Sequence, residues 1–249
     1  MTTATREKQP EIRQRILQEA IARFAHKGSE LTTIREITQA TQVNLASVNY
    51  YFGSKDGLLH AVLDAVLGPL SEARAQLLDA AEARYGDRPI PIDALLDALL
   101  RPLVQTAKTP DGGRIVVRLL QHLRATPEHS VTSLLSAQFD HVAHRFIDAL
   151  SRTLPHLARA EVIWRYEFAR GAAMHVLTDA DPRSGRLALL SQGLCDNRDD
   201  EQVLAHLLTF VSTGFCAPSH NDISHIHRME TPSHASSVPF FTPSGNNAG

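Results

Sequence analysis

The chain has 249 residues, of which 43% are hydrophobic, and its formal net charge is −2. This length can bury one large core or a small core beside a large one, and the composition lies far from that of disordered proteins. The first 60 residues carry eight Lys and Arg against six Asp and Glu, which leaves 17 against 21 for the remainder. The net charge is therefore slightly positive in the first 60 residues and slightly negative in the remainder. This distribution is expected when a nucleic-acid-binding domain precedes a second domain.

The cysteine content and the lack of long apolar runs indicate a cytoplasmic protein. Cys195 and Cys216 are the only two cysteines, and neither has a second cysteine close enough in sequence for a zinc-type pair. We therefore expect reduced thiols in a reducing compartment. The amino terminus lacks the apolar stretch of a signal peptide, and no apolar run approaches the roughly 18 residues that span a bilayer. We expect no membrane association.

Hydrophobic periodicity predicts an all-α protein. Apolar residues recur at helical spacing along most of the chain, and no segment alternates for long enough to indicate a strand. Gly68-Pro69 is a helix-breaking signal near the middle of one long apolar stretch. Beyond Lys55, the stripes and the intervening Gly and Pro residues predict helices at residues 56–67, 70–85, 92–106, 113–125, 130–154, 160–178 and 200–215.

The amino-terminal segment begins with two predicted helices. The first runs from Glu11 to His26, where apolar residues are spaced by four along one stripe, and Gly28 ends it. Thr33 and Glu36 have the spacing of a capping box, in which each side chain satisfies a backbone N–H group of the other residue. A second helix therefore starts at this point.

A third, short helix is predicted from Leu45 to about Tyr51, with Asn44 as its N-cap. Two short helices joined by a tight turn and braced by a longer helix match the helix-turn-helix arrangement, in which the second short helix enters the major groove of DNA. An ordinary three-helix bundle with a solvated polar surface is the alternative interpretation of the same pattern.

The third helix is expected to present a polar face. If Val48 points to the core, then at about 100° per residue Leu45 and Phe52 approximately do so as well. The residues left pointing outward are Ala46, Ser47, Asn49 and Tyr50. A small residue permits close approach to DNA, and the others can hydrogen-bond base edges or phosphates. Lys55 and the free N–H groups at the start of the next helix would form a phosphate clamp.

The amino-acid sequence of this segment resembles the amino-terminal signature of the tetracycline-repressor (TetR/AcrR) family of regulators. The resemblance covers about residues 11–60 and rests on Thr32-Thr33-Ile34-Arg35-Glu36-Ile37, Val43-Asn44 and Tyr50-Tyr51-Phe52-Gly53-Ser54-Lys55-Asp56-Gly57-Leu58-Leu59. It implies a homodimer with one recognition helix per subunit, a divergent helical ligand domain, and repression of a palindromic operator that a small molecule relieves. The positions that it makes DNA-proximal are Thr33, Asn44, Ser47, Asn49, Tyr50, Tyr51 and Lys55.

Three positions depart from the family pattern. Gln42 stands where the family usually has Gly, so either Gln42 adopts a left-handed backbone or the turn differs. Asn49 replaces a usual Tyr and Tyr51 a usual His, which puts the family's phosphate contacts at these two positions in doubt.

The domain organisation expected from these observations has four parts. Residues 1–10 form a flexible arm, residues 11–58 the helix-turn-helix DNA-binding domain, residues 59–216 a larger helical domain for ligand binding and dimerisation, and residues 217–249 a disordered tail. The tail assignment follows from a composition rich in Pro, Ser, Thr, Asn and His, with too little apolar surface to offset the entropy lost on ordering.

The larger domain supplies many apolar helices and few polar anchors, which suits a pocket for a hydrophobic effector but is also what any helical core looks like. The segment from Val43-Asn44 to Val48-Asn49-Tyr50 and Phe52 resembles a subgroup of the family that includes fatty-acid-responsive regulators, and this resemblance implies a fatty-acid-like effector. Arg118 lies among apolar residues, where a buried guanidinium requires an anionic partner. That partner is either a carboxylate ligand or an internal Asp or Glu, unless the side chain simply extends to water. The further candidate lining residues are His122, Trp164, Tyr166 and Arg170.

The predicted helices at residues 160–178 and 200–215 are candidates for a two-fold four-helix dimer interface. The residues proposed for close packing are Ala169, Ala172, Ala173 and Val176 on the first and Leu204, Leu207, Leu208, Val211 and Phe215 on the second. The core of a single subunit is the competing explanation.

Two other classes of function remain open at this point. A helical-bundle metal-binding enzyme or sensor would use Asp140, His141, His144 and Asp148, which are spaced by three and four on one helix. No Glu-x-x-His partner motif and no nucleophile motif accompanies them, so we expect neither an enzyme nor a cofactor. A DNA-binding architectural protein without an effector is the other alternative.

Overall fold

The structure is a computed structural model that describes residues 3–125, 129–195 and 199–219. Every regular element in these ranges is an α-helix, which confirms the predicted fold class. In chain order the helices are α1 (Thr3–Lys27), α2 (Ile34–Thr41), α3 (Leu45–Phe52), α4 (Lys55–Tyr85), α5 (Ile92–Val104), α6 (Ile115–Ala125), α7 (His129–Thr153), α8 (Arg159–Asp179), α9 (Arg186–Ser191) and α10 (Asp200–Cys216).

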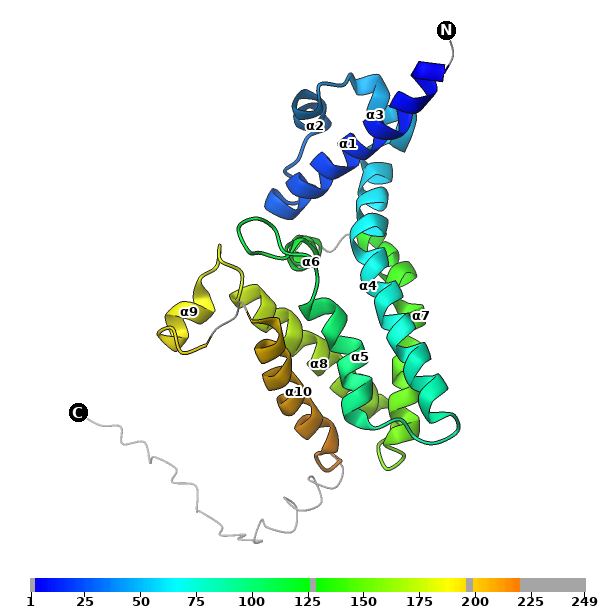
Figure 1. The fold of residues 1–249 in the computed structure, drawn as a ribbon, viewed down its shortest axis with the longest axis vertical. Helices are drawn as coiled ribbons and strands as arrows, with labels where there is room; N and C mark the ends of the chain where they lie inside the picture. The colour runs from blue at the N-terminus through cyan, green and yellow to red at the C-terminus, as the bar shows by residue number, and fades with distance from the viewer. Residues whose placement is uncertain (1–2, 126–128, 196–198, 220–249) are drawn as a thin grey trace, which may run out of the picture. The chain divides into compact units, whose positions relative to one another are not determined.

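The three amino-terminal helices and the start of α4 enclose a small core. Helix α1 packs against α2, α3 and α4 and so holds the two short helices in place (Figure 1). The buried side chains that make up this core are Ile16, Phe24, Ile37, Val48 and Leu58, none of which is exposed to solvent. Burial of such side chains contributes roughly 1.5–3 kcal/mol each and fixes the angle between α2 and α3.

Helix α4 is a single helix from Lys55 to Tyr85, although Gly68-Pro69 predicted a break between two helices. Pro69 removes one backbone donor from the helix but fits inside it. The inner apolar stripe continues on both sides of Pro69, because Leu67 and Leu70 are both buried. Burial of a continuous face therefore outweighs the local penalty of the proline, and the expected boundary at residues 58 and 59 falls inside this helix.

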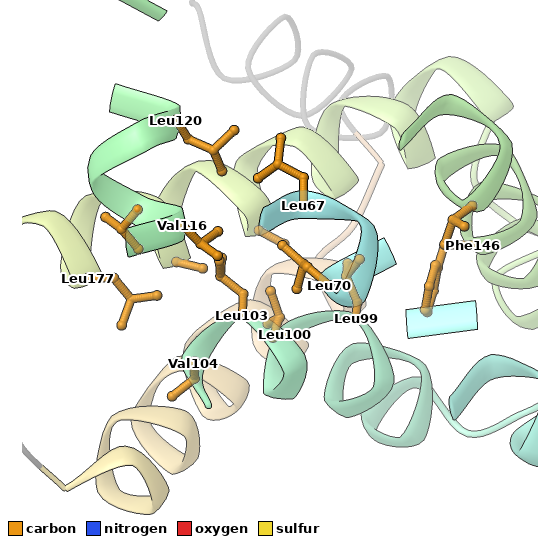
Figure 2. Close-up of a cluster of buried hydrophobic side chains, with 14 of the residues drawn as sticks. Leu67, Leu70, Leu99, Leu100, Leu103, Val104, Val116, Leu120, Phe146 and Leu177 are labelled. Carbon is orange, nitrogen blue, oxygen red and sulfur yellow. The ribbon is translucent and has the colours of Figure 1, made fainter. Parts of the chain in front are cut away.

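Helix α5 lies at the centre of the larger domain, where it packs against α4, α7, α8 and α10. Leucine and valine side chains from α4, α5 and α6 point toward one another and form the main hydrophobic core (Figure 2). Leu70, Leu103 and Leu120 converge there from the three helices, and Leu177 of α8 covers the side. On the other side, α6 packs against α1, so the amino-terminal helices rest on this domain as well as continuing into it through α4.

Two elements differ from the sequence expectations in extent. Helix α1 begins at Thr3, eight residues before the Glu11 that starts the apolar stripe. Helix α9 was not predicted, because its six residues show no apolar stripe and bury no side chain, and left-handed residues at Gly185 and Gln192 bound it.

Nearly all of the predicted tail, from residue 220 onward, lies outside the described residues. No helix in the described ranges has both the length and the apolar character required to cross a bilayer.

Candidate functional site

The start of α2 is held by a complete capping box, as the sequence predicted. Thr33 Oγ1 accepts from the Glu36 backbone N–H at 3.2 Å, and Glu36 Oε2 accepts from the Thr33 backbone N–H at 2.8 Å. Lys27 Nζ, at the end of α1, donates to Glu36 Oε1 at 2.6 Å. The Lys27 hydrogen bond and the two from Thr33 lower the pKa of Glu36 from 4.5 to about 2. The capping box thus also ties α1 to the helix that positions the turn.

The turn between α2 and α3 contains a left-handed glutamine. Gln42 has φ 56° and ψ 39°, and its backbone N–H donates to carbonyl oxygens at the end of α2. The turn therefore has a left-handed residue at the position where glycine is usual, and Gln42 adopts that backbone with a side chain attached. A non-glycine residue in this region is strained by roughly 1–2 kcal/mol.

Asn44 caps α3 and is joined to Ser47 by two hydrogen bonds. Asn44 Oδ1 accepts from the Ser47 backbone N–H at 2.8 Å and from Ser47 Oγ at 2.9 Å. Both side chains are among the predicted DNA-proximal set, and in this structure they fix the first turn of α3. Cap hydrogen bonds of this kind contribute about 1 kcal/mol to a helix.

The outward face of α3 consists of small and polar side chains. Ala46, Asn49 and Tyr50 are exposed, with 72% of Tyr50 accessible to solvent, whereas Val48 is fully buried. Leu45 was expected to face the core but is 57% exposed, because it occupies the first helical position, beyond the edge of the small core. The face opposite Val48 therefore carries hydrogen-bonding groups that stay exposed among the residues that the structure describes.

Two further predicted positions lie beside this face. The Tyr51 ring is half-buried and meets the Tyr50 ring edge-on, with 5.0 Å between the ring centres. Lys55 opens α4, and its Nζ lies 3.5 Å from the Glu30 carbonyl oxygen. The N-cap of α4 is Ser54, whose side chain accepts from the backbone N–H of residue 57. Lys55 and the first turn of α4 thus provide a cation beside free helix N–H groups.

A separate cavity of about 310 Å³ lies inside the larger domain between α4, α5, α6, α7 and α8. About half of its lining residues are apolar, with contributions from Leu70, Leu103, Leu120, Phe139, Val142, Ile147 and Met174. Its volume is at the lower end of the range found for small-molecule sites. Three of these residues, Leu70, Leu103 and Leu120, also belong to the core in Figure 2, so the cavity is continuous with the main packing of the domain.

The cavity contains one deeply buried cation, Arg74 of α4, which is only 6% exposed. Arg74 Nε donates to the Leu99 carbonyl oxygen at 2.8 Å. Within the described part of the chain, no Asp or Glu lies within ion-pair distance of Arg74. Burial lowers the pKa of Arg74 to about 10, with Tyr166 partly opposing this effect. At that pKa the guanidinium remains charged at neutral pH.

The sequence did not single out Arg74, although a signal was present. Arg74 occupies the same helical stripe as the buried residues Leu67, Leu70 and Leu78 of α4. A charged residue on an otherwise apolar stripe was the reasoning that selected Arg118 on α6. The expected break at Gly68-Pro69 separated Arg74 from Leu67 and made its inward position harder to recognise.

Only two of the five residues predicted to bind a ligand line this cavity, namely Tyr166 and Arg170. The guanidinium of Arg170 lies 5.5 Å from the centre of the Tyr166 ring, and burial raises the pKa of Tyr166. Trp164 is 64% exposed and stacks on Phe168, away from the cavity. His122 packs against α1, where its Nδ1 would lie 3.3 Å from a Cβ at Gly28.

Arg118 was expected to bind either a carboxylate ligand or an internal carboxylate, and the structure shows the second arrangement. Its Nε and Nη2 donate to Asp181 at 2.6 and 2.9 Å, and Nη2 also donates to Asp111 at 2.9 Å. Arg118 does not line the cavity. Asp181 and Asp111 satisfy this guanidinium, which is the internal-carboxylate alternative, and a role of Arg118 in ligand binding stays a prediction.

The four residues of the metal-site alternative do not form a metal centre in the structure. Asp140 and His144 border the cavity, while Asp148 forms an ion pair with Arg159 at 2.7 Å. Across residues 3–125, 129–195 and 199–219, no group of three His, Cys, Asp or Glu side chains is placed to hold a metal ion. This alternative receives no support from the structure.

Helices α8 and α10 present an exposed apolar surface, to which the residues suggested by the sequence contribute only in part: Ala172, Val176 and Leu208 are partly exposed. Ala169, Ala173, Leu204, Leu207, Val211 and Phe215 are buried in the core of the subunit itself. The most exposed large apolar side chains of the two helices are Trp164, Phe168 and Phe210, with 64–70% of each accessible to solvent. A groove of about 720 Å³ runs between the two helices, with Phe168 and Phe210 in its walls.

Comparison with known proteins assigns the chain to a family. The profile described as "Bacterial regulatory proteins, tetR family" matches residues 16–62, and that described as "Tetracyclin repressor-like, C-terminal domain" matches residues 97–214. The chain belongs to the TetR family of bacterial regulators. The resemblance noted in the amino-terminal sequence is confirmed, and the TetR match also includes most of the helical domain that carries the cavity.

Two curated relatives match this TetR-family chain over 81 residues at 40% identity: HTH-type transcriptional repressor Rv3405c of Mycobacterium tuberculosis and HTH-type transcriptional regulator Mb3439c of Mycobacterium bovis. The match spans 30% of this chain and 43% of each relative. Among solved structures, Salmonella enterica GusR aligns with 80% of this chain and 96% of its own, with 17% sequence identity and a TM-score of 0.43.

Proposed function

We propose that this protein is a dimeric transcriptional repressor that binds a palindromic operator through α3 and releases it when a small molecule occupies the cavity. The observation that carries the proposal is the exposed face of α3, which presents Ala46, Asn49 and Tyr50. Side-chain caps at the start of α2 and at the start of α3 hold the two helices in place. One of the curated relatives is named a transcriptional repressor, which supports repression over activation.

The chemistry of α3 suits reading of a major groove. Ala46 lets the helix backbone approach the base pairs closely, and the Asn49 amide can both donate to and accept from an adenine edge. We assign the Tyr50 hydroxyl to a base edge, with which it can form a further hydrogen bond. Helix α3 carries no charged residue, so phosphate binding falls to Lys55 and the N-terminus of α4, with Thr33 at the start of α2.

The second subunit is proposed to dock on α8 and α10. Trp164, Phe168 and Phe210 form an exposed apolar patch, which is unusual on a monomeric protein. Together with Leu187 of α9 and Leu194 after it, the same two helices line a second apolar groove of about 540 Å³, which lies next to the first along α10. A two-fold axis beside α8 and α10 would bury both grooves and create a four-helix interface.

Helix α4 provides the mechanical link between the cavity and DNA. Lys55 at one end belongs to the proposed DNA interface, and Arg74 lies in the cavity 19 residues further along the same helix, a separation of about 28 Å at 1.5 Å per residue. Two half-sites one turn apart require roughly 34–36 Å between recognition helices, so a shift of α4 by several Å would prevent simultaneous binding. Moving the population from mostly bound to mostly free requires about 5.5 kcal/mol of differential affinity.

The test is a selection of randomised duplexes by the purified full-length protein, at a low and a moderate salt concentration because phosphate binding is salt-dependent. Wild-type protein is compared with Tyr50→Ala and with Leu189→Ala, which removes an exposed side chain from α9. We expect wild type and Leu189→Ala to enrich one palindrome with half-sites about 10 base pairs apart. Enrichment of the same sequence by Tyr50→Ala to the same extent as by wild type would contradict the assignment of α3, and enrichment of no sequence would overturn the proposal.

A further inference from the structure

Arg74 is a buried cation whose charge no carboxylate of the described chain balances. Removing a guanidinium from water carries a large penalty unless an anion and further hydrogen bonds compensate it. The only hydrogen bond recorded for Arg74 within the described residues is the one from Nε to the Leu99 carbonyl oxygen, which leaves the Nη groups available. Because Arg74 lines the cavity, its remaining donors border the space that a ligand would occupy.

The other charged groups around the cavity lie nearer to solvent. They are Arg124, Asp140, Glu167 and Arg170. Arg124, Asp140 and Glu167 are exposed, and Arg170 already binds Glu167 through its Nη1. Charges in contact with water interact weakly with a ligand, whereas a charge in a desolvated pocket interacts strongly. Arg74 is therefore the group that sets the sign of charge preferred inside the cavity.

We propose that the effector is a compact organic carboxylate, whose carboxylate group accepts hydrogen bonds from Arg74 and whose apolar body fills the remainder of the cavity. This inference rests on the proposed function, in which the cavity is the effector site. The planar guanidinium fork matches a carboxylate with two parallel hydrogen bonds. The apolar wall around Leu103, Phe139 and Met174 suits a ring or a short branched chain, and about 310 Å³ excludes a bulky ligand.

Calorimetric titration of the full-length protein with benzoate and with benzamide tests this inference, since the two probes differ in charge but hardly in shape. The variants are Arg74→Met, which removes the guanidinium, and Arg84→Met, a matched control at an exposed position of the same helix. We expect wild type and Arg84→Met to bind benzoate about 10- to 100-fold more tightly than benzamide, as expected from a charged hydrogen-bond pair. Arg74→Met should lose this preference.

Three results would overturn the inference: equal binding of benzamide and benzoate, a preference for benzoate that survives in Arg74→Met, or no binding of benzoate at concentrations far above about 1 mM, where even a weak anion site saturates. A thermal melt shows that Arg74→Met is folded. The DNA selection does not depend on the result of this titration. A protein that enriches a palindrome but binds benzoate and benzamide equally would therefore still be a regulator, with an effector of another class.

Discussion

Arg118 of α6 and Asp181, directly after α8, form a buried two-point ion pair, with Nε–Oδ2 at 2.6 Å and Nη2–Oδ1 at 2.9 Å. Both residues are less than a tenth exposed. Gly113 leaves room for the guanidinium, since a Cβ at that position would lie 2.2 Å from Arg118 Nη2. The hydrogen bonds from Arg118 lower the pKa of Asp181. The pair fixes α6, which supports α1, to the end of α8.

Arg118→Met should destabilise the protein by about 3–5 kcal/mol, because it leaves the Asp181 carboxylate buried without its counter-charge. Urea unfolding at neutral pH measures this. Arg124→Met, at an exposed position of the same helix, is the control and should change the stability by less than about 0.5 kcal/mol. Equal effects of the two substitutions would show that the ion pair contributes nothing specific.

Gln42→Gly should stabilise the protein by about 1 kcal/mol, because glycine adopts the left-handed backbone of the turn without strain. The matched control is Gln39→Gly on α2, where the backbone is helical and glycine should destabilise by roughly 1 kcal/mol. Thermal and urea unfolding of the three proteins give both values. If Gln42→Gly were less stable than wild type, the glutamine side chain would have to stabilise the folded protein by more than its backbone strain destabilises it.

The capping box of α2 predicts a pH dependence through Glu36. Its pKa is lowered to about 2 in the folded protein from an ordinary 4.5. A lowered folded-state pKa means that the ionised form stabilises the fold, so this contribution is complete above about pH 4.5 and is lost as the pH falls toward 2. Urea midpoints of wild type and Glu36→Gln should therefore differ most near neutral pH and converge on acidification. A difference that stays constant down to pH 3 would contradict this role of Glu36.

Phe210→Glu should convert the dimer to a monomer, since it places a charge in the apolar surface of α8 and α10. Sedimentation velocity measures the change, and Leu31→Glu serves as the control because Leu31 is 72% exposed against 70% for Phe210 but lies between α1 and α2, outside the proposed interface. A dimer that persists in Phe210→Glu would place the interface elsewhere, and a monomeric wild-type protein would exclude the dimer altogether.

Local signals explain why much of the fold was predictable. The Thr33 capping box and the Asn44 cap act within one helical turn, so the sequence alone determines where α2 and α3 begin. The break expected at Pro69 was wrong because burial of residues on both sides, a tertiary effect, outweighs the local penalty. The outward positions of α3 followed from helical geometry, except at Leu45, where the core ends before the helix does.

The residues that line the cavity could not be predicted from the sequence, because they are set by how the helices pack. Arg74 and Arg118 both lie on apolar helical stripes, and only the arrangement of helices decides which of them meets an internal carboxylate. Asp181 lies 63 residues beyond Arg118 in the chain, outside any local pattern. The sequence therefore indicated that a buried arginine was present but selected the satisfied one. The same limit applies to the proposed dimer surface, where spacing could not separate core alanines from the exposed Phe168.

The most direct test of sequence-specific DNA binding through α3 is the ratio of affinities for the selected palindrome and for a shuffled duplex of the same length. Fluorescence anisotropy with wild type and Tyr50→Ala at one fixed, moderate salt concentration measures it. We expect a ratio of roughly 10³ or more for wild type. Tyr50→Ala should lose about 1–3 kcal/mol of this discrimination while remaining a dimer. A ratio near one for wild type, or an unchanged ratio in Tyr50→Ala, would contradict the central claim.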